Sequence, residues 1–159
     1  MLNRLHVLAL ALLATLAPTA PAGDRTAASD LIARGRYMVL VGHCNNCHTA
    51  GYMPSAGKVS EQLWLMGNPV GWRGKAGTTY AVNLRIYFAN LTEEAWLKAA
   101  RSIETRAPMP WWSLRDTSDD DLRAIYHYVR SLAPLGSPLG GVERKGKRDR
   151  FPLAKSSFY

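Results

Sequence analysis

Cysteine is scarce in this chain of 159 residues, which contains only Cys44 and Cys47. A disulfide between them would add little support to a domain of this size, because so short a loop removes little entropy from the unfolded chain. A structural zinc site needs four ligands, and no second Cys/His pair follows at a suitable spacing. A redox-active pair of the thioredoxin kind should accompany a βαβ pattern, which the sequence also lacks. These three classes of site are therefore disfavoured.

Internal repeats and long apolar runs are missing too. The run from Leu5 to Leu16 is too short to span a bilayer comfortably. Arg4 precedes it, and Ala20 and Ala22 follow as an A-x-A pattern, which is typical of a secretory signal. We expect residues 1–22 to be a removed signal peptide that sends the chain to the periplasm with no transmembrane segment. An uncleaved anchor is the alternative, but a stop-transfer pattern is missing, and so is a twin-arginine pair.

Acidic residues are outnumbered, since 12 Asp and Glu stand against 20 Lys and Arg, for a formal net charge of +8. Removal of the signal peptide takes away one basic residue and leaves about +7. In an exported protein this charge favours redox partners with acidic docking surfaces, or anionic membranes, over nucleic acid. The length suits one domain, which we place at residues 23–133. A basic, Pro/Gly-rich C-terminal extension follows at residues 134–159.

The two cysteines belong to the pentapeptide Cys44-Asn45-Asn46-Cys47-His48. Two thiols three positions apart can each form a thioether with one of the two vinyl groups at a porphyrin edge. His48 would then lie beneath the ring, where a neutral imidazole nitrogen can bind the iron as the proximal ligand. The pentapeptide therefore predicts one covalently attached haem c at Cys44, Cys47 and His48.

The ligand on the opposite face of the iron decides between electron transfer and chemistry on a bound molecule. Met109 lies in Pro108-Met109-Pro110, a stiff loop between two expected helices that can present its thioether to the metal. Met66 has enough chain to reach the iron and is our second choice. The other candidates lie near the attachment site, on the first helix or toward water: Met53, His43, Met38 and His127.

Three main helices are expected around this site. The first runs from about residue 30 to the cysteines, the second from about 92 to 103, and the third ends before Pro134. A glycine inside the first helix, Gly35, indicates close packing against another helix. Each helix begins at a residue whose side chain can cap it: Ser29 or Asp30, Thr92, and Thr117 or Ser118.

Residues 49–90 are rich in Gly, Pro and Asn, and only Ser60–Met66 looks able to form a brief helix. So long a stretch with little regular structure is usually functional or wrapped around a ligand. Its aromatic rings could cover the macrocycle, and its polar side chains could bond the propionates. For the propionate side we expect Trp72, Tyr80, Asn83 and Arg85.

Together, the pentapeptide, Pro108-Met109-Pro110 and a last helix ending Ile125-Tyr126-His127-Tyr128-Val129-Arg130-Ser131-Leu132 resemble a class I c-type cytochrome. The resemblance is closest to single-haem modules that begin Gly-Arg-Tyr, here at Gly35, including those in cytochrome subunits of periplasmic dehydrogenases. It implies an all-α cytochrome c fold of three main helices plus long haem-wrapping loops. It also implies axial His48 and Met109, and contact between Gly35 and Tyr128. The long middle loop and the C-terminal extension depart from the family pattern.

These features predict a periplasmic one-electron carrier that is not an enzyme. A haem iron with an axial ligand on each face rearranges little on reduction. The sequence also shows no convincing set of residues for acid, base or nucleophilic catalysis. One alternative is an electron-transfer subunit docked in a larger dehydrogenase or oxidase, which the tandem Trp111-Trp112 and the extension favour. The other is a ligand-binding or catalytic haem protein, which needs a polar donor such as His43 or His127 on an open face.

Overall fold

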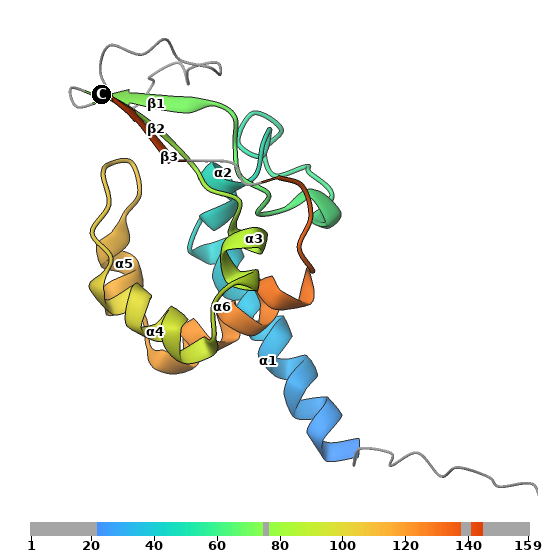
Figure 1. Cartoon of the computed structure of the whole chain (residues 1–159). Helices are drawn as coiled ribbons and strands as arrows, with labels where there is room; N and C mark the ends of the chain where they lie inside the picture. The colour runs from blue at the N-terminus through green and yellow to red at the C-terminus, as the bar shows by residue number, and fades with distance from the viewer. Residues whose placement is uncertain (1–21, 75–76, 138–140, 145–159) are drawn as a thin grey trace, which may run out of the picture.

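The computed structural model describes residues 22–74, 77–137 and 141–144, so the expected signal peptide lies almost entirely outside the described residues. Within them the chain forms six α-helices, one short 3-10 helix and three strands (Figure 1). None of these helices has both the length and the apolar character that crossing a membrane requires. The elements are α1 (Ala22–Val41), α2 (Cys44–His48), η1 (Glu61–Leu63), β1 (Gly71–Gly74), β2 (Gly77–Tyr80), α3 (Leu84–Ala89), α4 (Glu93–Ser102), α5 (Trp111–Asp116), α6 (Asp119–Ser131) and β3 (Gly141–Arg144).

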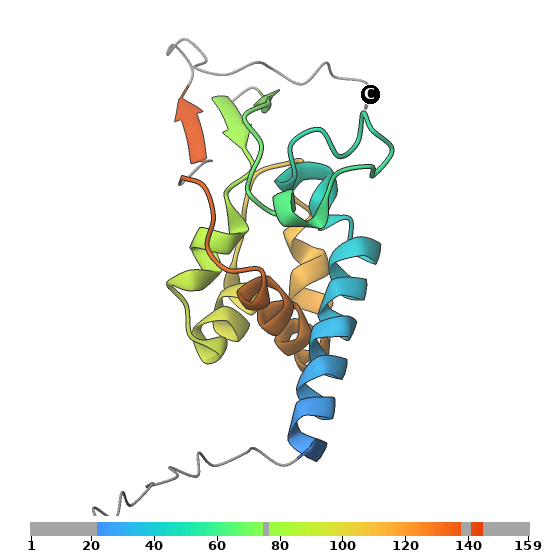
Figure 2. The same ribbon diagram turned by 90° about the vertical axis from the view of Figure 1, so that its right-hand side faces the viewer.

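Helices α1 and α6 pack closely against each other, and their contact organises the core (Figure 2). A Cβ atom added at Gly35 would lie 1.9 Å from the backbone oxygen of Ala124 and 2.7 Å from Cβ of Tyr128. The predicted close packing at Gly35 and its contact with Tyr128 are therefore confirmed. Buried apolar residues from α1, α3, α4 and α6, with two from the loop after η1, form one core: Val39, Phe88, Trp96, Ala100, Leu122, Ile125, Tyr128, Val129, Trp64 and Leu65.

Two of the predicted helix starts are confirmed by their capping hydrogen bonds. The Oγ1 atom of Thr92 accepts from the N–H of Ala95, and Oγ of Ser118 accepts from the N–H of Asp121. Both contacts satisfy backbone donors that have no partner inside the helix. The first helix starts eight residues earlier than expected, at Ala22, because alanines in its added turns favour helix formation. These turns extend past the other helices (Figure 1).

The expectation that residues 49–90 contain only one brief helix is wrong. The expected turn at Ser60–Met66 is present but short, as η1. The same stretch also contains α3 and the two strands β1 and β2. The expected all-α fold therefore describes the helical framework but misses a small sheet.

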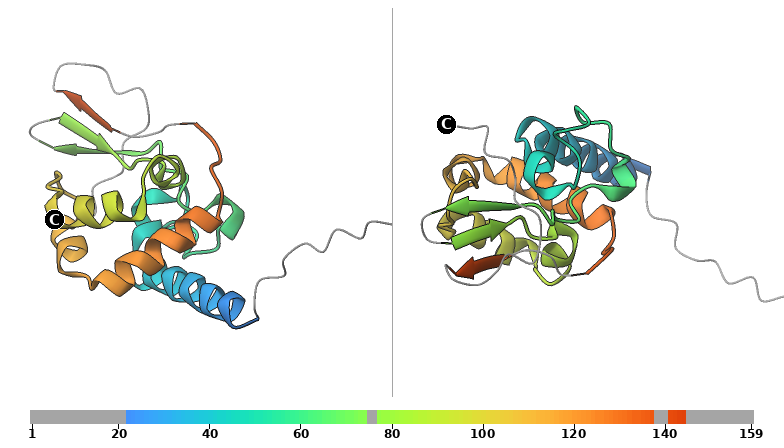
Figure 3. Two further views of the ribbon diagram at one scale, coloured as in Figure 1. Left: turned by 60° about the horizontal axis from the view of Figure 1, so that its bottom comes forward. Right: turned by 90° about the horizontal axis from the view of Figure 1, so that it is seen from above.

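This sheet is antiparallel with the order β1-β2-β3, and Figure 3 shows its strands side by side. Gly71 pairs with Tyr80 in the hairpin, and Tyr80 pairs in turn with Gly141 of β3. Because β3 belongs to the C-terminal extension, that segment contributes the third strand. Residues 138–140 and 145–159 of the extension lie outside the described residues.

Candidate functional site

The pentapeptide forms α2, which follows α1 at the end of that helix nearest the sheet (Figure 1). Between the two helices His43 adopts φ 57° in the left-handed region, so the chain changes direction before Cys44. The N–H of Asn46 donates to the carbonyl of His43 at 3.0 Å and closes the first turn of α2. This turn places two free thiols and an imidazole within five consecutive residues.

The environment of the thiols is unlike that of a redox-active cysteine pair. Burial raises the pKa of Cys44 to about 11, and burial also raises the pKa of Cys47. Thiol–disulfide oxidoreductases need the opposite, a thiol whose pKa is lowered so that the thiolate forms near neutral pH. The raised pKa values therefore disfavour disulfide exchange at these residues.

His48 is the best-defined group of the site. Its side chain is buried, with 8% of the residue exposed, and its Nδ1 atom lies 2.8 Å from the backbone oxygen of Val82. Because a carbonyl can only accept, Nδ1 carries the proton and Nε2 keeps its lone pair for a metal. Burial lowers the pKa of His48, although the bond to Val82 acts in the opposite direction. Lowering this pKa favours the neutral imidazole, which is the form that binds iron.

Three hydrogen bonds, two of them between backbone groups, tie α2 to the segment that carries Val82. The N–H of Gly67 donates to the carbonyl of His48 at 2.8 Å. Two residues earlier, the N–H of Leu65 donates to Oγ1 of Thr49 at 2.8 Å. The carbonyl of Leu65 in turn accepts from the N–H of Leu84 at 2.9 Å. The loop after η1 thus bridges α2 and the start of α3.

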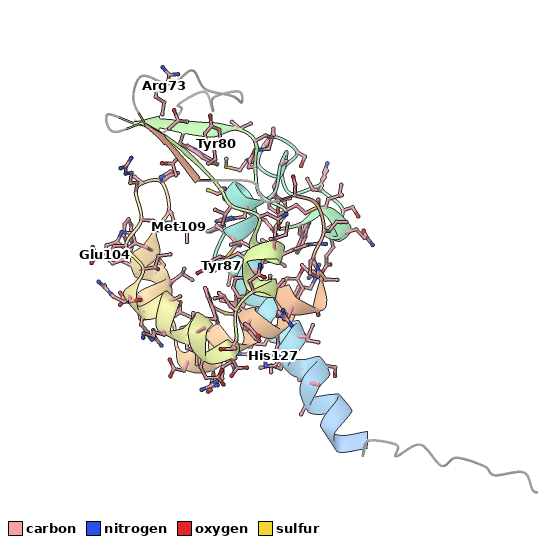
Figure 4. The ribbon with its side chains drawn as sticks, in the orientation of Figure 1. Arg73, Tyr80, Tyr87, Glu104, Met109 and His127 are labelled. Atoms are coloured by element: carbon pink, nitrogen blue, oxygen red, sulfur yellow. The ribbon has the colours of Figure 1, made fainter. Side chains whose placement is uncertain are left out.

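Met109 and Met66 occupy different surroundings. Met109 is half-buried in the loop before α5, and in Figure 4 it points from that loop toward the side where α2 and α3 lie. Met66 precedes Gly67, which is bonded to the carbonyl of His48. The Cε atom of Met66 would be 3.0 Å from a Cβ added at Gly136. Met66 is therefore held on the side of His48 and the C-terminal extension.

Two other histidines, His43 and His127, belong to the part of the chain that the structure describes. His127 places Nε2 2.7 Å from Oε2 of Glu93, in a contact between α6 and α4. Figure 4 shows it well separated from Met109. His43 is exposed in the turn before α2. His127 therefore provides no polar donor near Met109.

Trp72 and Tyr80 lie on the two strands of the β1–β2 hairpin but on opposite faces, because Tyr80 pairs with Gly71 and Trp72 pairs with Thr79. Tyr80 is buried, and a Cβ added at Gly71 would lie 2.6 Å from its ring, so the ring covers the opposite strand. Trp72 is half-buried and pairs with Thr79. Arg73, between them on the hairpin, points away from the helices in Figure 4. The hairpin therefore carries one aromatic ring on each of its two faces.

Arg85 is buried, with 4% of the residue exposed, and its guanidinium donates to four backbone carbonyls. Nε donates to Trp64, Nη1 to Leu132, and Nη2 to Glu61 and Gln62, at 2.8 to 3.1 Å. These bonds join the middle loop to the end of α6. The structure thus gives Arg85 a structural role, and its bond to a propionate stays a prediction.

Asn83 is buried as well, with 3% of the residue exposed. Its Nδ2 donates to the carbonyls of Leu135 and Ser137, and its Oδ1 accepts from the N–H of Ile86 at the start of α3. Its donors are directed at the C-terminal extension, so its bond to a propionate also stays a prediction. The sequence gives no sign of the role of Val82, because a backbone carbonyl has no side-chain signature.

Comparisons with known proteins point to dehydrogenase subunits. No family model and no solved structure matches the chain. It is 28% identical over 150 residues to one of the subunits of nicotinate dehydrogenase from Pseudomonas putida. It is 30% identical over 150 residues to the cytochrome c subunit of alcohol dehydrogenase (quinone) from Gluconacetobacter polyoxogenes, and equally to that of Komagataeibacter europaeus. These matches cover 87 to 88% of the chain, but 11% of the first relative and 30% of the other two. The chain is thus similar to one part of dehydrogenase subunits, two of which are cytochrome c subunits.

Proposed function

We propose that this chain is an electron-transfer component of a larger periplasmic dehydrogenase and holds one covalently attached haem c. The observation that carries the proposal is the state of His48, which is buried with Nδ1 bonded to Val82 and Nε2 left for a metal. The two thiols of the same short helix are free for thioether bonds. The donor set and its surroundings therefore fit a haem of the c type.

In this proposal Cys44 and Cys47 would hold the porphyrin through thioether bonds, and His48 and Met109 would bind its iron. When bound, the haem supplies a one-electron couple, which a thioether ligand and burial bias toward the reduced state. The hydrogen bond to Val82 fixes the tautomer and the orientation of the imidazole. Trp72, Tyr80, Asn83 and Arg85 remain the residues that we propose for the propionate side.

Spectra of the purified protein and of three variants test the ligands. Wild type should carry covalent porphyrin mass and show the weak long-wavelength band of a methionine bound to ferric haem. Met109→Ala should lose this band, whereas Met66→Ala and the exposed-site control Met53→Ala should keep it. Loss of the band in Met66→Ala alone would move the sixth ligand to Met66. A wild-type protein without porphyrin would end the proposal.

The comparisons favour a docked component over a freely diffusing carrier, since the relatives are dehydrogenase subunits. The tandem Trp111-Trp112 supports the same view, because Trp112 is 51% exposed on the short helix that follows Met109. The test is purification of the tagged protein from its native host without detergent. Co-elution with a dehydrogenase, which Trp112→Ser weakens and Leu63→Ser does not, supports docking. Elution as a haem-loaded monomer supports the free carrier.

A further inference from the structure

We infer that Asn83 is a positioning residue through which the C-terminal extension sets the orientation of the His48 imidazole. The inference rests on the proposed haem site and assigns a function to the extension. It does not require Asn83 to contact the haem. The coupling runs through one peptide group, Val82–Asn83, which has His48 on one side and the extension on the other.

The side chain of Asn83 is fixed at both ends. Its Nδ2 donates to the carbonyl of Leu135 at 2.9 Å and to that of Ser137 at 3.2 Å, 52 and 54 residues further along the chain. Its Oδ1 accepts from the N–H of Ile86 at 3.2 Å. With 3% of the residue exposed, water competes little for these bonds. The extension and α3 together therefore hold the Cα of Asn83 in place.

The carbonyl that accepts from His48 belongs to the same planar unit as the N atom of Asn83. Because a peptide group is rigid, a rotation at Asn83 turns the oxygen of Val82 relative to Nδ1 of His48. Gly67, whose φ is +86°, packs against this peptide group. A Cβ added at Gly67 would lie 3.0 Å from the N atom of Asn83 and 3.1 Å from the carbonyl carbon of Val82. The peptide group is thus packed between Gly67 and the bonds of Asn83.

A carbonyl that accepts from Nδ1–H makes the imidazole a more basic ligand and stabilises the oxidised metal. Weakening this bond therefore favours the reduced state and raises the midpoint potential. The bonds from Asn83 to the extension keep the carbonyl aligned and hold the potential down. In the intact protein the extension acts on the potential through this alignment.

Asn83→Ser tests the coupling. Serine also caps helices, so α3 keeps its start, while the two donors to the extension are lost. The matched control is Asn90→Ser at the other end of α3, which removes the donor to the carbonyl of Ile86. By spectroelectrochemistry, Asn83→Ser should show a higher midpoint potential than wild type with its methionine band retained, and Asn90→Ser should match wild type. Equal potentials in all three proteins would overturn the inference.

Gly136→Ala perturbs the same hydrogen bonds of Asn83 from the side of the extension. It tests the coupling if Asn83→Ser does not fold. Gly136 has φ +81°, and an added Cβ would lie 3.4 Å from Nδ2 of Asn83. This variant should also raise the potential. Gly51→Ala is its control, because Gly51 has φ +76° and no atom of the described residues would lie within 4 Å of an added Cβ. Unshifted potentials in haem-loaded variants would reject the coupling alone, whereas wild type without haem would reject the proposed function.

Discussion

At the scale of single residues, Gly35 leaves no space for a side chain where α1 meets α6. We expect Gly35→Ala to lower the free energy of unfolding by about 1–3 kcal/mol, because the added Cβ meets backbone of Ala124, which cannot rotate away. Chemical denaturation measures the change. Gly74→Ala is the control, since the nearest atom of the described residues to its added Cβ would be the oxygen of Gly77, at 3.7 Å. Equal losses in the two variants would show that the α1–α6 contact relaxes freely.

Single residues also show how far the sequence predicts the site. The pentapeptide and the spacing of its groups could be read directly, and Gly35 could be placed at a helix contact. The acceptor for Nδ1 of His48 could not be predicted, because every residue type has the same backbone carbonyl as Val82. For Arg85 and Asn83 the residue type indicated a polar contact, but only the fold shows that the acceptors are carbonyls of distant segments.

At the scale of secondary-structure elements, an ion pair joins α1 to the first turn of α6. Nε of Arg34 lies 2.7 Å from Oδ1 of Asp121, and the hydrogen bond from Arg34, with one from Ser118, lowers the pKa of Asp121. A carboxyl group with a lowered pKa in the folded state adds stability above its unfolded pKa, about 3.9 for Asp. This contribution is lost as the pH falls through the folded value.

Arg34→Gln should therefore weaken the pH dependence of stability. Between about pH 6 and about pH 3, the free energy of unfolding should fall more in wild type than in the variant. Without the hydrogen bond from Arg34, the pKa of Asp121 is lowered less, so its protonation costs less stability. Urea denaturation at several pH values measures this, with Lys98→Gln on the exposed face of α4 as a control that keeps the wild-type slope. A variant with an unchanged slope would contradict this role of the ion pair.

Two helices with local capping signals were predicted, whereas α3, which Asn83 caps, and the strands were not. Thr92 and Ser118 mark α4 and α6 because capping is decided within one turn. The strands Gly71–Gly74, Gly77–Tyr80 and Gly141–Arg144 have four residues each, begin with glycine and lack a clear apolar alternation. Their pairing joins segments more than sixty residues apart in the β2–β3 case, which no local pattern reveals.

At the scale of the whole molecule, the net charge of about +7 that remains after removal of the expected signal peptide should show in the kinetics of the proposed electron transfer. Raising ionic strength from about 0.01 M to about 0.15 M shortens the Debye length from about 30 Å to about 8 Å. Reduction of the haem-loaded protein by a separate acidic redox protein should become slower over this range. An uncharged small reductant is the control and should reduce it at a salt-independent rate. A protein–protein rate indifferent to salt would remove electrostatic attraction from the proposal.

The bonds of Asn83 to Leu135 and Ser137 also bear on how this protein can change during evolution. They end on main-chain oxygens, so a substitution at either position leaves the acceptor in place. An insertion or deletion between residues 134 and 137 would instead move both oxygens out of reach. Natural variants that keep Asn83 should therefore tolerate amino-acid replacements at positions 135 and 137 while preserving the length of this segment.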